Sequence, residues 1–263
     1  MNLKMHQVDS FTRDLFGGNP AAVIVLDGWL EDSTMQAIAI ENNLSETAFL
    51  VGNEPGQYAI RWFSPICEID FCGHATLAAA HVLFDQQPTL QELHFTTLQV
   101  GELKARRASG GLIAMDFPSC PPHMEFETPS ALLDGVSVKP SEVWRNQQAY
   151  FLVYQQQAQV KALEVDLELL KTLAPYDVVV TAPGEEHDFV SRYFWPANGG
   201  AEDPVTGSIH AGLTPFWAKR LGKDELLAYQ ASKRGGVLHC QQLGARVTIA
   251  GHAKTYFEGT VFL

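Results

Sequence analysis

The sequence predicts an α+β protein of two pseudo-repeated lobes, each a curved, mainly antiparallel, barrel-like sheet around a central buried helix. Each half of the chain contains one helix-like run that is apolar on almost every side and must therefore be covered all round. Short apolar runs separated by turn residues surround it in the same order in both halves. Prolines cluster at residues 118–122, which is typical of a crossing segment. We therefore expect lobes at residues 1–117 and 118–263, a division that also allows the last strand to pack back on the first lobe.

The first half is predicted to contain short strands interrupted by two helices. Residues 31–43 place Met35, Ile38 and Ala39 at helical spacing. Residues 73–84 are apolar almost all round, so this helix is predicted to be buried. The strands are expected at residues 4–11, 21–26, 47–51, 58–63, 93–100 and 112–117.

The second half is predicted to repeat this plan. Helices are expected at residues 165–174 and 208–221, and Pro215 inside the second one predicts a kink or a local break. Consecutive strands are joined by short turns rather than long crossovers, which favours antiparallel pairing. The strands are expected at residues 149–154, 177–182, 189–195, 226–231, 237–241, 246–250 and 255–262.

Composition limits the function classes. The 263 residues are 46% apolar and 18% charged, as in a globular protein with a sizeable core, and carry a formal net charge of −12. This charge argues against nucleic acid or an anionic membrane as the main partner, but not against a small anionic substrate. The N-terminus lacks a signal-peptide pattern and the four cysteines form no CxxC pair, so we expect a cytoplasmic protein with reduced thiols. Neither an HExxH motif nor a GxGxxG or Walker-type loop occurs, so neither a metal nor a nucleotide cofactor is expected.

Two similar segments point to chemistry. Residues 71–76 and 202–208 each place a Gly and a small polar side chain at the start of an apolar, helix-like run. Helix starts have free backbone N–H groups and a partial positive charge, so two of them make a cradle for a carboxylate. The ionisable residues Glu46, His74 and Asp203 accompany these segments. The combination predicts an enzyme that moves a proton on a small organic acid.

Each of these residues also has a purely structural interpretation. Glu46 is either a base at the mouth of a strand or an exposed loop residue. His74 is either a proton carrier or a helix-capping residue. Asp203 is either an assisting acid or a helix-start residue favoured by the dipole. Cys72 raises the possibility of a two-thiol racemase, but residues 203–206 of the second half hold no thiol, so we expect Cys72 to be a small core residue.

Several blocks of the chain, taken together and in order, resemble the PhzF-like family of phenazine-biosynthesis-type isomerases. The blocks are Phe16-Gly17-Gly18-Asn19-Pro20-Ala21-Ala22-Val23, Leu44-Ser45-Glu46-Thr47-Ala48-Phe49, Phe71-Cys72-Gly73-His74-Ala75-Thr76, Arg192-Tyr193-Phe194, Glu202-Asp203-Pro204-Val205-Thr206-Gly207-Ser208 and Gln230-Ala231-Ser232-Lys233-Arg234-Gly235-Gly236. The resemblance implies the two-lobed fold of diaminopimelate epimerase with the site in the cleft between the lobes, no cofactor, no metal and a homodimer.

The resemblance also implies roles for individual residues. Glu46 would be the base, and His74 and Asp203 would assist it. The substrate would be held by Gly73, Gly207, Ser208 and Asn19. The stretch at residues 118–148 looks short for the family, and the substrate does not carry over. We therefore expect a cofactor-independent isomerase acting on a small, cyclic or unsaturated carboxylic acid. The alternatives are an epimerase or racemase of an amino acid or related acid, and a non-catalytic protein that binds a small acid.

Overall fold

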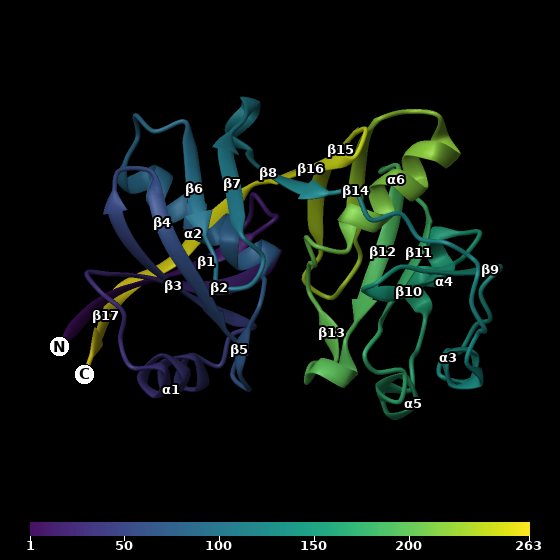
Figure 1. The fold of residues 1–263 in the computed structure, drawn as a ribbon. Coiled ribbons are helices and arrows are strands. Elements are labelled where there is room, and N and C mark those ends of the chain that lie inside the picture. The colour runs from purple at the N-terminus through teal and green to yellow at the C-terminus, as the bar shows by residue number, and fades with distance from the viewer. The chain divides into compact units, whose positions relative to one another are not determined.

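The computed structural model describes residues 1–263, apart from the side chain of Asn53. The chain divides into two compact units: unit 1 comprises Met1–Asp116 and Ala250–Leu263, and unit 2 comprises Phe117–Ile249. The last strand, β17 (Ala253–Phe262), thus belongs to unit 1 (Figure 1). Strands and helices occur in both units, so the predicted α+β class is confirmed. Among the described residues, the helices fall short of the length and apolar character that crossing a bilayer requires.

Unit 1 is built on a mixed, mainly antiparallel sheet. β1 pairs antiparallel with both β2 and β17, whereas β2 pairs parallel with β3 and β4 with β6. The helices are α1 (Asp32–Asn42) and α2 (Gly73–Gln86), with a 3₁₀ turn η1 (Ser109–Gly111). The strands are β1 (Asn2–Ser10), β2 (Asn19–Leu26), β3 (Glu46–Glu54), β4 (Gln57–Phe63), β5 (Glu68–Ile69), β6 (Glu92–Thr96), β7 (Glu102–Arg107) and β17; β8 (Ile113–Pro118) leads from unit 1 into unit 2.

The helix α2 is the buried element of unit 1, as the apolar run predicts. It packs against β1, β2 and β3, and its side chains from Ala75 to Ala80 are buried. Most residues of this stretch are alanines, whose small side chains let the helix approach the strands closely. The helix therefore fixes the position of its own first turn, where His74 lies.

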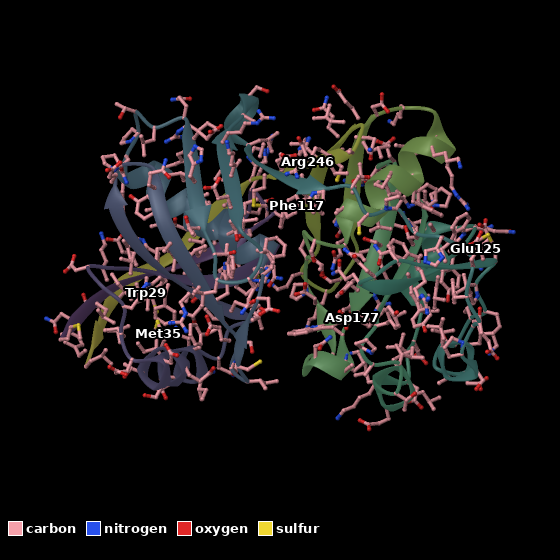
Figure 2. All side chains as sticks on the ribbon, viewed as in Figure 1. Trp29, Met35, Phe117, Glu125, Asp177 and Arg246 are labelled. Carbon is pink, nitrogen blue, oxygen red and sulfur yellow. The ribbon has the colours of Figure 1, made fainter. Side chains whose placement is uncertain are left out.

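The helix α1 covers a separate patch of the same unit. Met35, Ile38 and Ala39 pack into a cluster with side chains from β2, β3 and β4, and Figure 2 labels Met35 where α1 faces the sheet. The helix ends at Asn43, whose φ of 49° is the left-handed conformation that Asn tolerates better than most residues. This turn directs the chain straight into β3, so Glu46 becomes the first residue of that strand.

Unit 2 has a second mixed sheet. β10 pairs parallel with β11, β12 pairs parallel with β14, and the other pairs among β9–β15 are antiparallel. The helices are α3 (Ser130–Asp134), α4 (Gln157–Ala162), α5 (Leu167–Lys171) and α6 (His210–Leu221), with a 3₁₀ turn η2 (Pro196–Asn198). The strands are β9 (Glu142–Arg145), β10 (Ala149–Val153), β11 (Asp177–Pro183), β12 (Phe189–Phe194), β13 (Glu202–Asp203), β14 (Glu225–Gln230) and β15 (Gly236–Leu243); β16 (Arg246–Gly251) leads back to unit 1.

The helix α6 contains Pro215 and continues through it as one helix, so of the predicted kink or local break, the break does not occur. A proline lacks an N–H, so the carbonyl of Ala211, four residues earlier, loses its usual partner. The backbone N–H of Cys120 donates to this carbonyl at 2.9 Å and replaces the missing bond. The proline is therefore tolerated because a neighbouring segment satisfies the helix.

Several predicted boundaries are wrong. The helix predicted from Ser208 starts at His210, after a turn in which the N–H of His210 donates to Gly207. The strand predicted at 93–100 ends at Thr96, because Thr97 and Gly101 close a turn. The helix predicted at 165–174 is confined to α5. Short elements outside the predicted set also occur, namely β5, β7, β9, β13, α3 and α4.

Candidate active site

Glu46 lies at the start of β3 and is buried. In the parallel register of β2 and β3, Glu46 lies opposite Ala21, and 5% of its surface is exposed. The alternative interpretation as an exposed loop residue is therefore wrong. A carboxylate in such a place must interact with nearby polar groups, because burying an isolated charge is costly.

His74 is the polar group next to it. It is the second residue of α2 and is 4% exposed. Its Nε2 lies 2.9 Å from Oε2 of Glu46, so β3 and the start of α2 bring together two of the residues predicted from sequence. The hydroxyl of Ser10 on β1 donates to the backbone carbonyl of His74 at 2.8 Å and fixes the helix start from the other side.

The contact between Glu46 and His74 has the distance of an ion pair but not the direction of a standard hydrogen bond. Oε2 of Glu46 is buried and has no hydrogen bond of standard geometry among the described residues. A buried oxygen in this state is unusual in native proteins and points to function. Here the oxygen is in ion-pair contact with the His74 ring, so a proton can pass between the two side chains.

Charge favours the protonated form of His74. Burial alone would lower the pKa of His74, but the neighbouring Cys72 and Glu46 outweigh it and raise that pKa well above its usual value. Burial raises the pKa of the Cys72 thiol itself to about 11, so near neutral pH the thiol is uncharged. The negative charge that stabilises imidazolium near neutral pH therefore comes from Glu46.

The second ring nitrogen of His74 also has close neighbours. Nδ1 lies 3.1 Å from Nδ2 of Asn19 and 3.3 Å from Sγ of Cys72. Asn19 is fully buried on β2, and its Oδ1 accepts a hydrogen bond from Ser45 at 3.1 Å. The amide predicted to bind substrate thus contacts two residues of the site itself.

Glu46, Cys72 and His74 are also residue types that bind metal ions. One ligand atom from each lies within 4.8 Å of the others, and all three side chains are buried. Thiol, imidazole and carboxylate together suit an ion such as Zn²⁺. The partial positive charge at the start of α2 opposes a bound cation, however.

Asp203 belongs to unit 2, where a separate network holds it. The hydroxyl of Thr206 donates to its carboxylate, and Nε2 of Gln230 donates to its backbone carbonyl at 2.8 Å. Oε1 of Gln230 accepts from the N–H of Thr206 at 2.8 Å. Gln230 is fully buried on β14 and therefore clamps the loop from both ends.

Gly207 and Ser208 follow in the turn that leads to α6. The hydroxyl of Ser208 accepts a hydrogen bond from Gln148 at 2.9 Å, and the same Gln148 nitrogen donates to the hydroxyl of Tyr193 at 3.0 Å. His210, the first residue of α6, donates from Nδ1 to the carbonyl of Thr206 at 2.8 Å. The segment is thus held by side chains from other elements.

Sequence reasoning missed two of the residues that organise these segments. Gln230 lies in one of the blocks that resemble the family, and this resemblance is the sequence signal that could have identified it. Gln148 stands outside such a block and follows a polar pair on a loop, so nothing in the sequence marks it. By contrast, Arg192 of another block makes a two-bond ion pair with Glu202 at 2.7 and 3.0 Å, which anchors β13 to β12.

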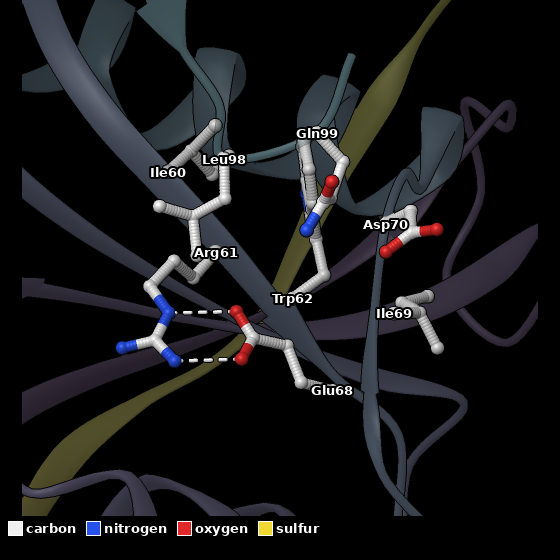
Figure 3. A pocket seen from close by; sticks show the side chains of 8 residues that line it. All are labelled: Ile60, Arg61, Trp62, Glu68, Ile69, Asp70, Leu98 and Gln99. Carbon is white, nitrogen blue, oxygen red and sulfur yellow. Dashed lines mark hydrogen bonds and ion pairs between the residues drawn. The ribbon is translucent and has the colours of Figure 1, made fainter.

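Unit 1 also contains a pocket of about 140 Å³ beside β4 and β5, shown in Figure 3. The guanidinium of Arg61 in its wall makes two bonds of 2.6 Å to Glu68 and one of 2.8 Å to Asp32. Its charge is therefore neutralised by the protein. None of the predicted site residues is among the described residues that line it, which are Ile60, Arg61, Trp62, Glu68, Ile69, Asp70, Leu98 and Gln99.

Comparison with known proteins gives a consistent picture at the level of sequence. The PhzC-PhzF family model, described as phenazine biosynthesis-like protein, matches residues 8–259. An uncharacterized isomerase of Pseudomonas aeruginosa is 48% identical, and the match covers 100% of both chains. The similarity therefore extends over both units.

Solved structures agree with this similarity. A PhzF-family phenazine biosynthesis protein of Enterococcus faecalis superposes with a TM-score of 0.94 at 43% identity, over 100% of each chain. A protein of Pseudomonas aeruginosa described as a predicted epimerase superposes with a TM-score of 0.78 at 22% identity, over 99% of each chain. At that identity the second match speaks for the fold alone.

Proposed function

The chain belongs to the family of phenazine biosynthesis-like proteins and is an isomerase, and from this premise we propose that it moves a proton on a small carboxylic acid with Glu46 as the general base. The observation that carries the proposal is the buried Glu46 carboxylate, with an oxygen 2.9 Å from Nε2 of His74. A cyclic or unsaturated acid suits this chemistry, because conjugation spreads the charge that develops when a C–H proton leaves.

The proposed reaction balances without an oxidant or reductant. Glu46 takes a proton from a carbon of the substrate, and the electron pair of that C–H bond enters the conjugated system. The proton then returns to a different carbon of the same molecule, either from Glu46 or through His74, and a double bond shifts. Positioned acid–base catalysis of this kind contributes roughly 10²–10⁴-fold.

The substrate carboxylate is proposed to bind where the first turn of α2 presents its backbone N–H groups, at Gly73 and His74. Helix starts bind anions through these N–H groups and the helix dipole. The raised pKa of His74, caused by the balance of burial against its anionic neighbours, would add a positive charge at the same place. Asp203 is proposed to assist the proton transfer, and Gly207 and Ser208 to hold the substrate.

The test is proton exchange in D₂O. Small cyclic and unsaturated carboxylic acids are incubated with the protein and followed by NMR, which reports both binding and C–H exchange. Glu46→Gln is expected to keep the fold and the ligand binding and to reduce deuterium incorporation by 10²-fold or more, about the range of general-base catalysis. Undiminished exchange in this variant would remove Glu46 from its role.

The same experiment separates the proposal from an epimerase. Deuterium incorporated at a different carbon, with a shifted double bond, supports the isomerase reaction. Deuterium at the original carbon with inversion of its configuration supports epimerisation instead. Cys72 makes the second outcome worth measuring, because its sulfur lies 3.3 Å from His74 and offers a second acid.

A further inference from the structure

The buried amide of Asn19 has a place in the site that substrate binding does not explain. Its nitrogen lies 3.1 Å from Nδ1 of His74, on the side of the ring away from the Glu46 contact, and its oxygen accepts from Ser45. Asn19 is fully buried and stands opposite Ser10 in the antiparallel pairing of β1 and β2. The adjoining backbone is also fixed, because Gly18 has a φ of 60° and a Cβ there would collide with the carbonyl of Ser10.

The imidazolium form of His74 and its neutral form with the proton on Nε2 require opposite partners at Nδ1. In the neutral form with the proton on Nε2, Nδ1 is an acceptor and the Asn19 nitrogen donates to it. In the imidazolium form Nδ1 carries a proton and needs an acceptor. A buried N–H without one costs about 1–3 kcal/mol.

An amide can serve both forms without changing the space that it fills. Rotation by half a turn about the last side-chain bond exchanges oxygen and nitrogen, which have nearly the same size. The hydroxyl of Ser45 can both donate and accept, so it remains a partner in either orientation. The sulfur of Cys72, 3.3 Å from Nδ1, is the other neighbour on this side and is a weak acceptor.

From this geometry, and resting on the proposed function, we propose that Asn19 is a positioning residue that keeps Nδ1 of His74 hydrogen-bonded in both protonation forms while the ring stays beside Glu46. The titratable groups that act on the ring are Glu46 from β3 and Cys72 at the start of α2. Ser10 from β1 and Asn19 from β2 are uncharged. The amide therefore adapts to the protonation state of His74 instead of setting a fixed charge.

The test follows the imidazole of His74 by ¹⁵N NMR in the free protein across pH, where the ring shifts report which nitrogen carries the proton. Asn19→Asp replaces the adaptable amide with a permanent acceptor. It is expected to hold the proton on Nδ1 and raise the midpoint of the His74 titration by about 1 pH unit or more. Asn42→Asp is the matched control, because Asn42 makes a comparable amide–hydroxyl bond with Thr47 at 3.0 Å.

An Asn19→Asp midpoint equal to that of wild type, or moved no further than that of Asn42→Asp, overturns the proposal. If Asn19→Asp does not fold, Ser45→Ala provides the test, since it removes the partner that orients the amide. The Nδ1 shift of His74 is then expected to change at constant pH, and an unchanged shift overturns the proposal.

These readouts need no substrate, so they are independent of the proposed reaction. If the titration behaves as expected but exchange in D₂O is not catalysed, the role of Asn19 at His74 stands and the proposed function fails. If exchange is catalysed but the midpoint of the His74 titration is unchanged in Asn19→Asp, the proposed function stands and the role of Asn19 at His74 fails. Where exchange is measurable, the pH profile of kcat in Asn19→Asp is expected to move with the His74 midpoint.

Discussion

At the scale of single residues, the site depends on two buried side chains of opposite charge, each of which stabilises the charged form of the other. Glu46 and His74 are 5% and 4% exposed, and their side chains meet at 2.9 Å. In so dry a place each charge is costly alone and stabilised by the other. Changing one partner should therefore be measurable at the other, in the absence of any substrate.

Replacing Glu46 by Gln keeps the shape of the side chain and removes its charge. The pKa of His74, which burial alone would lower and its anionic neighbours raise, is expected to fall in Glu46→Gln. The proton affinity of the ring should drop by about tenfold or more, measured as the midpoint of the His74 ¹⁵N titration. Glu68→Gln, on β5 and paired with Arg61, is the control and should leave that midpoint in place.

The sequence could name Glu46 and His74, because both stand in blocks that resemble a family and both have chemistry suited to proton transfer. It could not show that Ser45, Asn19 and His74 form one hydrogen-bonded chain. That chain joins a loop, a strand and a helix across 55 residues. Such contacts follow from strand register and side-chain orientation, which residue types do not encode locally.

At the scale of elements, α6 contains a histidine that must remain neutral. His210 is fully buried between Phe189 and the carbonyl of Thr206. Burial lowers its pKa to about 4, although the bond to Thr206 opposes the shift. The helix therefore has an acid-sensitive point at its first residue.

This histidine should make unfolding depend on pH. In the unfolded chain His210 takes up a proton near pH 6.5, whereas in the folded protein it does so only near pH 4. The unfolded state thus binds more protons between these values, and stability falls as pH is lowered from about 6.5 to about 4. The loss amounts to about 3 kcal/mol.

Urea unfolding at several pH values measures this loss. His210→Gln is expected to flatten the curve in this window, and the partly buried His187 gives the control variant His187→Gln, which should keep the wild-type curve. A His210→Gln curve as steep as that of wild type would show that another group causes the acid sensitivity.

Whether the sequence predicted a helix or strand depended on how much of that element is buried. Continuous apolar runs marked α2 and β10 correctly, because both are buried along most of their length. β7 (Glu102–Arg107) and β9 (Glu142–Arg145) were missed because both are short, contain several charged residues and are only partly buried. The start of α6 was misplaced because a tight turn, with bonds between residues three apart, precedes the regular helix.

At the scale of the whole molecule, unit 1 is assembled from both ends of the chain. β1 pairs with β17 along its full length, from Asn2 opposite Phe262 to Ser10 opposite Ala253. The N–H of Leu263 donates to the carbonyl of Met1 at 2.8 Å. Unit 2, by contrast, is one uninterrupted stretch of sequence.

Ending the chain after His252 removes β17 and is expected to destabilise unit 1 selectively. The lost backbone ladder should cost on the order of 5 kcal/mol, at about 1 kcal/mol per bond. Hydrogen exchange is expected to show β1 amides losing protection while those of β10, β11 and β12 keep theirs. Deleting Leu263 alone is the control. Equal loss of protection in both units would contradict this selectivity.

The pairing of the two chain ends has a consequence for biosynthesis. The ribosome makes β1 before unit 2 and β17 after it. All of unit 2 has therefore been synthesised before β17, the strand that pairs with β1, is made. The half of the protein that holds Glu46 and His74 can reach its final form only after β17 has been made.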